Sequence, residues 1–255
     1  MGDLAYMMLM PFLFFFLFFL AYLFRKRKVE KILFSEFDES EKDLEARDFF
    51  NRILKIERSA KAFYYAEVIF LIINTFFILF GGYKTYLEEV EFVKEFPSFS
   101  ISPLSSVLIK FMAPIIMWVL VFFLLIFAMI MKKKENKRIT KMLDNLEKVK
   151  HLKFAKEDFL RSDRILATGV VSMSDIKLGD RYLFSVYPAY IIPYIYIQKI
   201  EVERFYRRGG SIYYLDIILK RSFQNIKIYF AKKDVAEKVR EFILERNKDL
   251  SKREY

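Results

Sequence analysis

Two uncharged apolar runs, each of 21 residues, limit what this chain can fold into. They extend over residues 4–24 and 111–131. At about 1.5 Å per helical residue, either run covers the ~30 Å hydrocarbon core of a bilayer. A third run, residues 68–83, reaches a similar length when residues 62–66 are added across Glu67. The sequence therefore predicts three membrane spans, at about 4–24, 62–83 and 108–131.

The charges around these runs predict an orientation in the membrane. The first run is preceded by Asp3 and followed by Arg25-Lys26-Arg27-Lys28, which is the reverse of the order in a cleaved signal peptide. Residues 25–61 contain 11 Lys and Arg, whereas residues 84–106 contain two, against four Glu. Because cytoplasmic loops are enriched in Lys and Arg, we expect an outside N-terminus and a cytoplasmic C-terminus. The expected location is the plasma membrane of a prokaryote.

Apolar residues recur at helical spacing beyond the second and third runs, on the predicted cytoplasmic side. One set is Phe50, Ile53 and Leu54, in a helix that we expect to start near Ser40 and to run into the second span. The other set continues the third span and comprises Ile139, Met142, Leu143, Leu146 and Val149. The two stripes predict either a short antiparallel stalk or two helices that lie flat on the lipid. Gly81-Gly82 predicts the end of the second span.

After residues 161–164 the apolar period changes from that of a helix to that of a strand. The β-rich segments are RILATGVVS, RYLFSVY, IQKIEVERF, SIYYLDIILK and NIKIYF, and the third and fourth are joined through Arg207-Arg208-Gly209-Gly210. An amphipathic helix then follows at about 234–246. We therefore expect an α+β membrane protein with three transmembrane helices and a C-terminal antiparallel sheet or barrel, capped by one helix. The expected domains are residues 1–151, with the spans and the stalk, and residues 152–255.

The stretch IPYIYIQKIEV at 192–202, the hairpin at Gly209-Gly210, the strand SIYYLDIILK and the closing helix occur in a familiar order. This order resembles the pleckstrin-homology-like (PH-like) fold, and in particular the bacterial PH-like domains that are attached to membrane helices. The resemblance covers about residues 164–246. It implies a cytoplasmic module that binds or scaffolds, and not an enzyme.

The residue types restrict the chemistry. The chain contains no Cys and one His, His151, which excludes disulfides and thiolate metal sites. It contains no Walker-type phosphate loop, no HExxH and no GxSxG motif. We therefore expect no catalytic residues, no cofactor and no metal. His151 lies in the basic segment KVKHLKF and is expected to be a solvated linker residue.

A net charge of +11 predicts an anionic partner. Lys132, Lys133 and Lys134 follow the third span, where they either contact anionic headgroups or only fix the topology. Arg207 and Arg208 lie at the predicted hairpin tip and can contact headgroups, an acidic partner surface or only water. Tyr213 and Tyr214 would lie on opposite faces of one strand, so we expect no exposed aromatic platform and no nucleic-acid binding.

Polar residues inside the predicted spans are the other candidate site. Glu67 and Asn74 would lie within the membrane, Glu67 near Arg25 or Lys61 and Asn74 in an interhelical hydrogen bond. Lys110 can extend its ammonium group to the interface and needs no functional role.

These patterns predict a membrane-tethered module that recognises a protein partner or anionic lipid headgroups at the cytoplasmic face. The alternative is a subunit of a transport or lipid-handling complex that acts through its spans. The expected partners are membrane lipids and either another protein or further copies of this chain.

Overall fold

The fold is that of a computed structural model. It describes the backbone of residues 2–99, 101–207, 210–220 and 225–253, and the side chains of 9–55, 60–98, 101–206, 210–220 and 225–250. The chain forms two compact units. The first comprises Met1–Arg25 and Ala60–Lys134, and the second comprises Lys26–Ser59 and Glu135–Tyr255.

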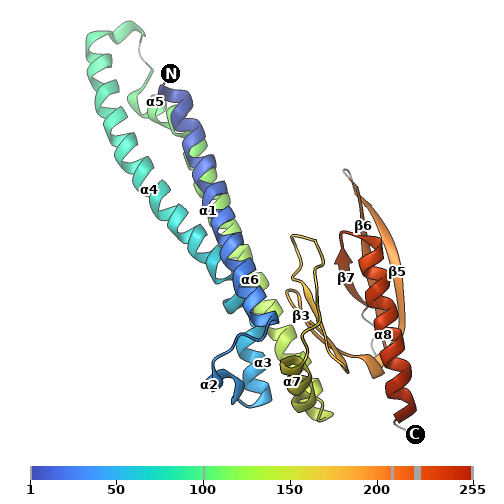
Figure 1. The fold of residues 1–255 in the computed structure, drawn as a ribbon. Coiled ribbons are helices and arrows are strands. Elements are labelled where there is room, and N and C mark those ends of the chain that lie inside the picture. Colours follow the sequence, from blue (N-terminus) through green and yellow to red (C-terminus); the bar gives the residue numbers. More distant parts are fainter. Residues whose placement is uncertain (1, 100, 208–209, 221–224, 254–255) are drawn as a thin grey trace. The chain divides into compact units, whose positions relative to one another are not determined.

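Helices form the first unit. Three helices are long and apolar enough to cross a membrane, and each also continues into the second unit: α1 (Gly2–Leu33), α4 (Ile56–Glu95) and α6 (Met112–Lys148) (Figure 1). A short 3₁₀ turn (Pro97–Phe99) and α5 (Pro103–Lys110) connect α4 to α6. The predicted third span, residues 108–131, is therefore interrupted at Phe111. Residues 108–110 belong to α5, and α6 begins at Met112.

The first unit has a small core and a large apolar exterior. Met10, Phe70 and Val121 are buried together, and the ring of Phe14 meets that of Phe70 edge-on at 5.4 Å. Many of the large side chains point outward; Phe12, for example, is 71% exposed. An aromatic and aliphatic exterior of this kind suits contact with lipid.

The expectation that Gly81-Gly82 is a helix terminus at the end of the second span is wrong, because helix α4 continues to Glu95. A Cβ atom at Gly81 would lie only 2.8 Å from the ring of Phe111. Phe111 is buried at the break between α5 and α6. The missing side chain of Gly81 thus makes room for that ring against α4.

The helical part of the second unit is here called the collar, residues 26–54 and 135–161. It contains α2 (Glu39–Lys42), α3 (Ala46–Leu54), α7 (Leu152–Arg161) and the ends of α1 and α6. Most of the two predicted apolar stripes lies in its core, since Phe50, Ile53, Ile139 and Leu143 are fully buried there. Val149, the last residue of the second stripe, is instead 47% exposed. The predicted continuous helix is wrong in two places. Ser40 lies inside α2, and Lys55, with ψ of 138°, separates α3 from α4.

The long helices α1 and α6 end in the same way. Ser35 (φ 56°) and Lys150 (φ 58°) are left-handed, and the N–H of the following residue bonds back to the carbonyl of Lys31 or Leu146. This is the Schellman ending, in which glycine is the usual left-handed residue. Neither sequence position carries that glycine signal, so the two helix ends could not be found from the sequence.

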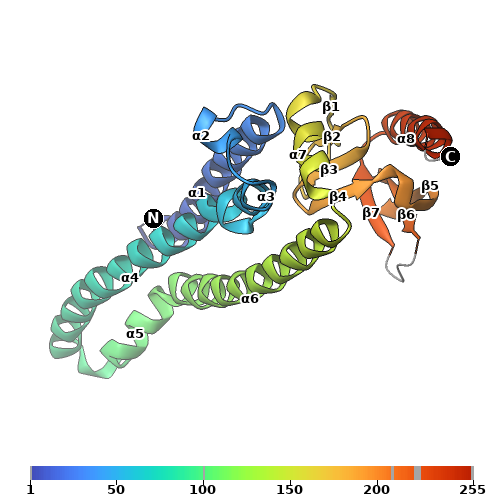
Figure 2. The ribbon, with the colours of Figure 1, turned by 90° about the horizontal axis from the view of Figure 1, so that it is seen from below.

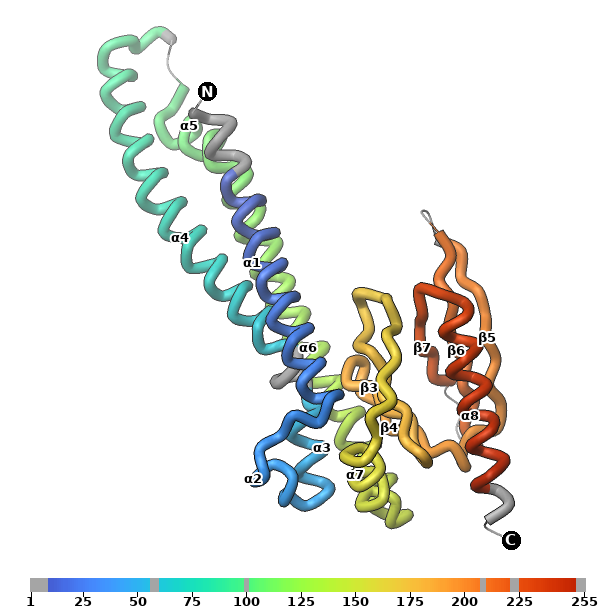
Figure 3. Tube along the Cα trace, viewed as in Figure 1, coloured from blue at the N-terminus to red at the C-terminus, as the bar shows by residue number. Residues whose placement is uncertain are grey.

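The C-terminal part of the second unit contains two antiparallel sheets. The first has the order β1 (Ile165–Leu166), β2 (Ile176–Leu178), β3 (Tyr182–Val186) and β4 (Ala189–Pro193), and the second has β5 (Ile197–Arg207), β6 (Gly210–Leu219) and β7 (Ile226–Phe230). The helix α8 (Lys233–Arg253) packs on the second sheet (Figures 2 and 3). The predicted antiparallel sheet with one C-terminal helix is thus present as two sheets.

Both faces of the first sheet are buried. Ile176, Leu183 and Ile192 face the core shared with β5–β7 and α8, whereas Tyr182, Phe184 and Ile191 pack in the collar core. This is why β3 is buried along its whole length. Strands β2 and β4 were not predicted, because β2 has three residues and neither strand alternates between buried and exposed residues.

Candidate functional site

A pocket of about 720 Å³ opens in the collar. Leu44, Ala46, Leu152, Phe154 and Leu160 supply apolar lining from the start of α3 and from α7. Its volume is typical of a site for a small molecule or for a few side chains of a partner. No sequence pattern pointed to it, because its walls come from segments about 100 residues apart.

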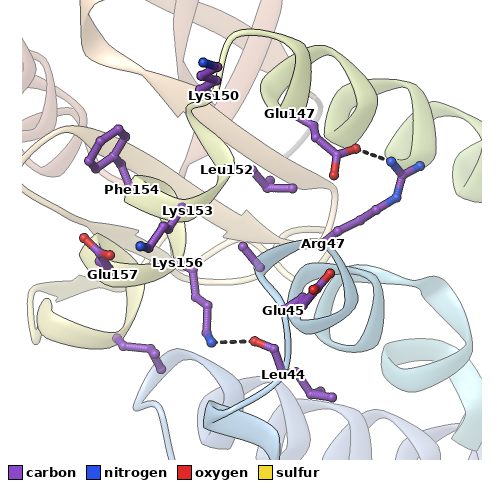
Figure 4. Close-up of a pocket in the computed structure, with 12 residues that line it drawn as sticks. Leu44, Glu45, Arg47, Glu147, Lys150, Leu152, Lys153, Phe154, Lys156 and Glu157 are labelled. Atoms are coloured by element: carbon purple, nitrogen blue, oxygen red, sulfur yellow. Dashed lines mark hydrogen bonds and ion pairs between the residues drawn. The ribbon is translucent and has the colours of Figure 1, made fainter.

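Charged side chains line the same pocket (Figure 4). Arg47 forms ion pairs with Asp144 and Glu147, which join α3 to α6. The ammonium of Lys156 donates to the carbonyl of Leu44 at 2.6 Å. The other charged lining residues are Glu45, Lys150, Lys153 and Glu157. The pocket therefore combines an apolar lining with both cationic and carboxylate side chains.

His151 is not the solvated linker residue that the sequence predicts. It is partly buried between two tyrosines, with Nδ1 2.7 Å from the hydroxyl of Tyr182 and Nε2 3.4 Å from that of Tyr196. The hydroxyl of Tyr182 also lies within hydrogen-bond distance of the His151 carbonyl, at 3.3 Å. Burial raises the pKa of Tyr182, so this phenol stays protonated. His151 thus fixes the link between α6 and α7 against the first sheet.

Lys177 is a buried amine that the sequence did not reveal. Its side chain is 1% exposed, and its ammonium donates to the carbonyl of Leu33 at 2.7 Å and to the hydroxyl of Ser35 at 2.6 Å. The ammonium also lies 4.4 Å from the ring centroid of Phe159. Lys177 therefore satisfies a free carbonyl at the end of α1 and ties β2 to it. Burial lowers the pKa of this lysine to about 8, although Asp163 and Asp158 act in the opposite sense.

Asp158 organises the turn between β2 and β3. Its carboxylate accepts the backbone N–H groups of Asp180, Arg181 and Tyr182 at 2.8–3.0 Å. Burial raises the pKa of Asp158, and the three N–H donors oppose that rise. A Cβ at Gly179 would lie 2.1 Å from the Asp158 carboxylate, so the glycine allows this close approach.

The polar residues of the spans are buried in the first unit. Glu67 is 5% exposed, and its Oε2 has no hydrogen-bond partner among the described residues. The sequence predicts Arg25 or Lys61 as the neighbour of Glu67. In the structure the guanidinium of Arg25 lies 5.7 Å from the ring centroid of Phe63, and the ammonium of Lys61 lies 5.3 Å from that of Tyr65.

Asn74 is fully buried and donates to the carbonyl of Pro114 at 2.9 Å, which is the predicted interhelical hydrogen bond. Its Oδ1 is buried without a partner in the described part of the chain. Lys110 pairs with Glu89 at 3.0 Å, so its ammonium is engaged by α4.

The predicted basic contacts lie in two separate units. In the first, Lys133 and Lys134 are exposed, and the ammonium of Lys132 lies 5.6 Å from the ring centroid of Tyr64. In the second, the backbone of Arg207 ends β5, while its side chain and all of Arg208 lie outside the described residues.

Other exposed residues occur near the hairpin tip. Phe205 is 51% and Tyr206 is 71% exposed, whereas Tyr214 is buried and Tyr213 is partly buried. The outer end of the hairpin therefore exposes two aromatic side chains, Phe205 and Tyr206, for which the sequence predicts no role.

Within the described ranges, no group of three or more Asp, Glu or His side chains is arranged to hold a metal ion. The fold and these sites define a class of α+β protein. One unit contains helices that are long and apolar enough to cross a membrane, and the other contains two antiparallel sheets. No family model, curated protein or solved structure matches this chain.

Proposed function

We propose that this protein is a membrane-tethered binding module of a prokaryotic plasma membrane. Its PH-like C-terminal domain recognises a protein partner or anionic lipid headgroups at the cytoplasmic face. The order of a four-stranded sheet, a three-stranded sheet and a final helix supports the PH-like assignment. The orientation follows from the distribution of Lys and Arg around the spans.

The observation that carries the proposal is the construction of the collar. The ends of α1 and α6 pack with α3, α7 and the first sheet in one hydrophobic core. Lys177 caps α1, and Arg138 donates from α6 to the carbonyl of Ala189 at 2.6 Å. The collar and the first sheet are thus packed together within the second unit, which gives a docking module a rigid scaffold.

The pocket of the collar is the candidate contact for a protein partner. We would place a photoreactive amino acid at Lys153, on its wall, and irradiate native membranes that contain the full chain. The matched control is the same amino acid at Lys238, an exposed residue of α8. A discrete protein adduct at residue 153 that is absent at 238 would support a partner.

A second experiment addresses lipid headgroups. The full chain in neutral nanodiscs is mixed with phosphatidylglycerol vesicles or phosphatidylcholine vesicles, and the bound fraction is measured at low and high salt. Binding to the anionic vesicles alone, weakened by salt, would support headgroup recognition. The binding module would be refuted if no adduct formed at residue 153 and neither kind of vesicle bound.

One observation favours the alternative, a subunit of a transport or lipid-handling complex. Glu67 and Asn74 place buried oxygen atoms without partners among the described residues inside the first unit. Polar groups at such positions in a membrane are typical of pathways and relays. Under this alternative, Glu67→Gln with Asn74→Ala abolishes activity; under the binding proposal, the adduct at residue 153 persists in the same variant.

A further inference from the structure

The outer end of the β5–β6 hairpin extends beyond the rest of its sheet. Strands β5 and β6 pair from Ile197 with Leu219 out to Arg207 with Gly210. Strand β7 pairs with Tyr213–Ile217 of β6 and does not accompany the outer end. Residues 205–207 and 210–212 therefore form a two-stranded ribbon (Figure 1).

Two aromatic side chains are exposed on this ribbon, one on each face. Tyr206 is paired with Ser211, and Phe205 is paired with Ile212 on the opposite face. Both aromatic side chains are more than half exposed. A two-stranded ribbon has little core of its own, so these side chains are not needed to fill one.

A cation accompanies the aromatic side chains. The guanidinium of Arg204 lies 4.3 Å from the ring centroid of Tyr206, and its Nε donates to the hydroxyl of Ser211 at 2.8 Å. In the sequence from 204 to 215 there are three Arg and no Asp or Glu. Aromatic and Arg side chains together are typical of the interface between lipid headgroups and acyl chains.

Under the proposed tethering, a lipid surface lies a short distance along the chain from the second unit. The segment of α6 from residue 135 to its end at Lys148 is about 21 Å long at 1.5 Å per residue. Strand β5 has 11 residues, about 36 Å at 3.3 Å per residue. The hairpin is thus longer than the helical segment that separates its domain from Lys134, and the tether gives a high local concentration of bilayer.

We propose that the outer end of this hairpin docks on the anionic surface of the bilayer that anchors the chain, with Phe205 and Tyr206 in the interface and Arg204 against headgroups. This inference rests on the proposed tethering of the domain to a membrane. It concerns a surface distinct from the collar pocket, so each can fail without the other.

The absence of Cys from the chain allows a clean test. A nitroxide attached to Ser211→Cys in the full chain reports the depth of the hairpin through its accessibility to oxygen and to a water-soluble nickel complex. The chain is measured in detergent, in phosphatidylcholine nanodiscs and in nanodiscs that also contain phosphatidylglycerol. We expect nickel accessibility to fall several-fold in the phosphatidylglycerol nanodiscs, and high salt to restore most of it.

Three controls make the result specific. A label at Ile212→Cys, on the other face, avoids loss of the Ser211–Arg204 bond and should show the same protection. A label at Val171→Cys, which is exposed in the β1–β2 loop, should remain accessible to nickel in every medium. Phe205→Ser with Tyr206→Ser should return the label at residue 211 to the accessibility seen in detergent.

Equal nickel accessibility of residues 211 and 212 in detergent and in both kinds of nanodisc would overturn the proposal. Protection that appears only after a second protein is added would also overturn it, since the hairpin would then be a protein contact. In either case, an adduct from residue 153 would still support the binding module. That module is refuted separately, when no adduct forms at residue 153 and no vesicles bind.

Discussion

At the scale of single residues, Gly179 has the most restrictive position. It lies where any Cβ would collide with the carboxylate of Asp158, which holds three backbone N–H groups. We expect Gly179→Ala to displace that carboxylate and to lower the free energy of unfolding by about 2–4 kcal/mol. Chemical denaturation of the full chain, followed by circular dichroism, measures this loss.

The matched control is Gly82→Ala, because a Cβ there meets Val107 at an ordinary 3.5 Å. Within helix α4 this change should be neutral or should stabilise by up to ~1 kcal/mol. Equal effects of the two substitutions would contradict the role given to Asp158.

The buried amine of Lys177 predicts an unusual pH dependence. Its pKa is about 8 in the folded chain and 10.5 ordinarily. Between these values the unfolded chain binds a proton that the folded chain does not, so the free energy of unfolding rises with pH. The rise from this group is on the order of 1–3 kcal/mol and is absent below pH 8.

Denaturant unfolding at pH 7.5 and 9.5 tests this dependence in the native chain and in Lys177→Met. The native chain should gain more stability than the variant between the two pH values. The same gain in both proteins would show that another group titrates in this window.

Both Lys177 and His151 show what the sequence could not predict at this scale. A lysine and a histidine among charged neighbours suggest solvent, and only the three-dimensional fold brings Leu33, Ser35 and Tyr182 to them. Asn74 was predictable, because an amide inside an apolar helix must find a partner and found the carbonyl of Pro114.

At the scale of elements, the end of α6 gives a further prediction. Lys150 has a positive φ, which costs a residue with a Cβ about 1 kcal/mol relative to glycine. We expect Lys150→Gly to raise the free energy of unfolding by about that amount, measured by the same denaturation. Ser35 offers no such gain at the end of α1, because its hydroxyl accepts the bond from Lys177.

The control is Lys148→Gly, two residues earlier and still within α6. There glycine should lower stability by up to ~1 kcal/mol, since the backbone is helical. A loss of stability in Lys150→Gly would contradict the Schellman geometry.

The helices and the long hairpin were predictable because their patterns are long. Three apolar runs and the alternation of β5 and β6 appear in the sequence itself. Strand β2 is too short to show a pattern, and β4 lacks the polar alternation that marks a strand because the collar and the second sheet bury opposite faces of one sheet.

At the scale of the whole molecule, the second unit is assembled from two separate stretches of the chain. We expect residues 152–255 alone to be unstable, because Phe159 and Phe184 would lose Phe50 and the rest of the collar core. A single chain in which a flexible linker joins 26–59 to 135–255 should instead fold. Limited proteolysis and binding of a hydrophobic dye compare the two.

Replacement of Phe50 by Asp in the linked chain provides the control, because it places a charge at the centre of the collar core. That variant should be digested as rapidly as residues 152–255. Equal resistance of all three proteins would show that the sheets fold without the collar.

The divided second unit also sets an order of events during synthesis. Residues 26–54 leave the ribosome before two of the three apolar helices are made, and Phe159 follows Phe49 by 110 residues. At roughly 5–20 residues per second, the aromatic face of α3 waits about 5–20 s for the side chains that cover it. During that interval the nascent chain carries an uncovered aromatic surface, which is open to contact with other apolar surfaces in the cell.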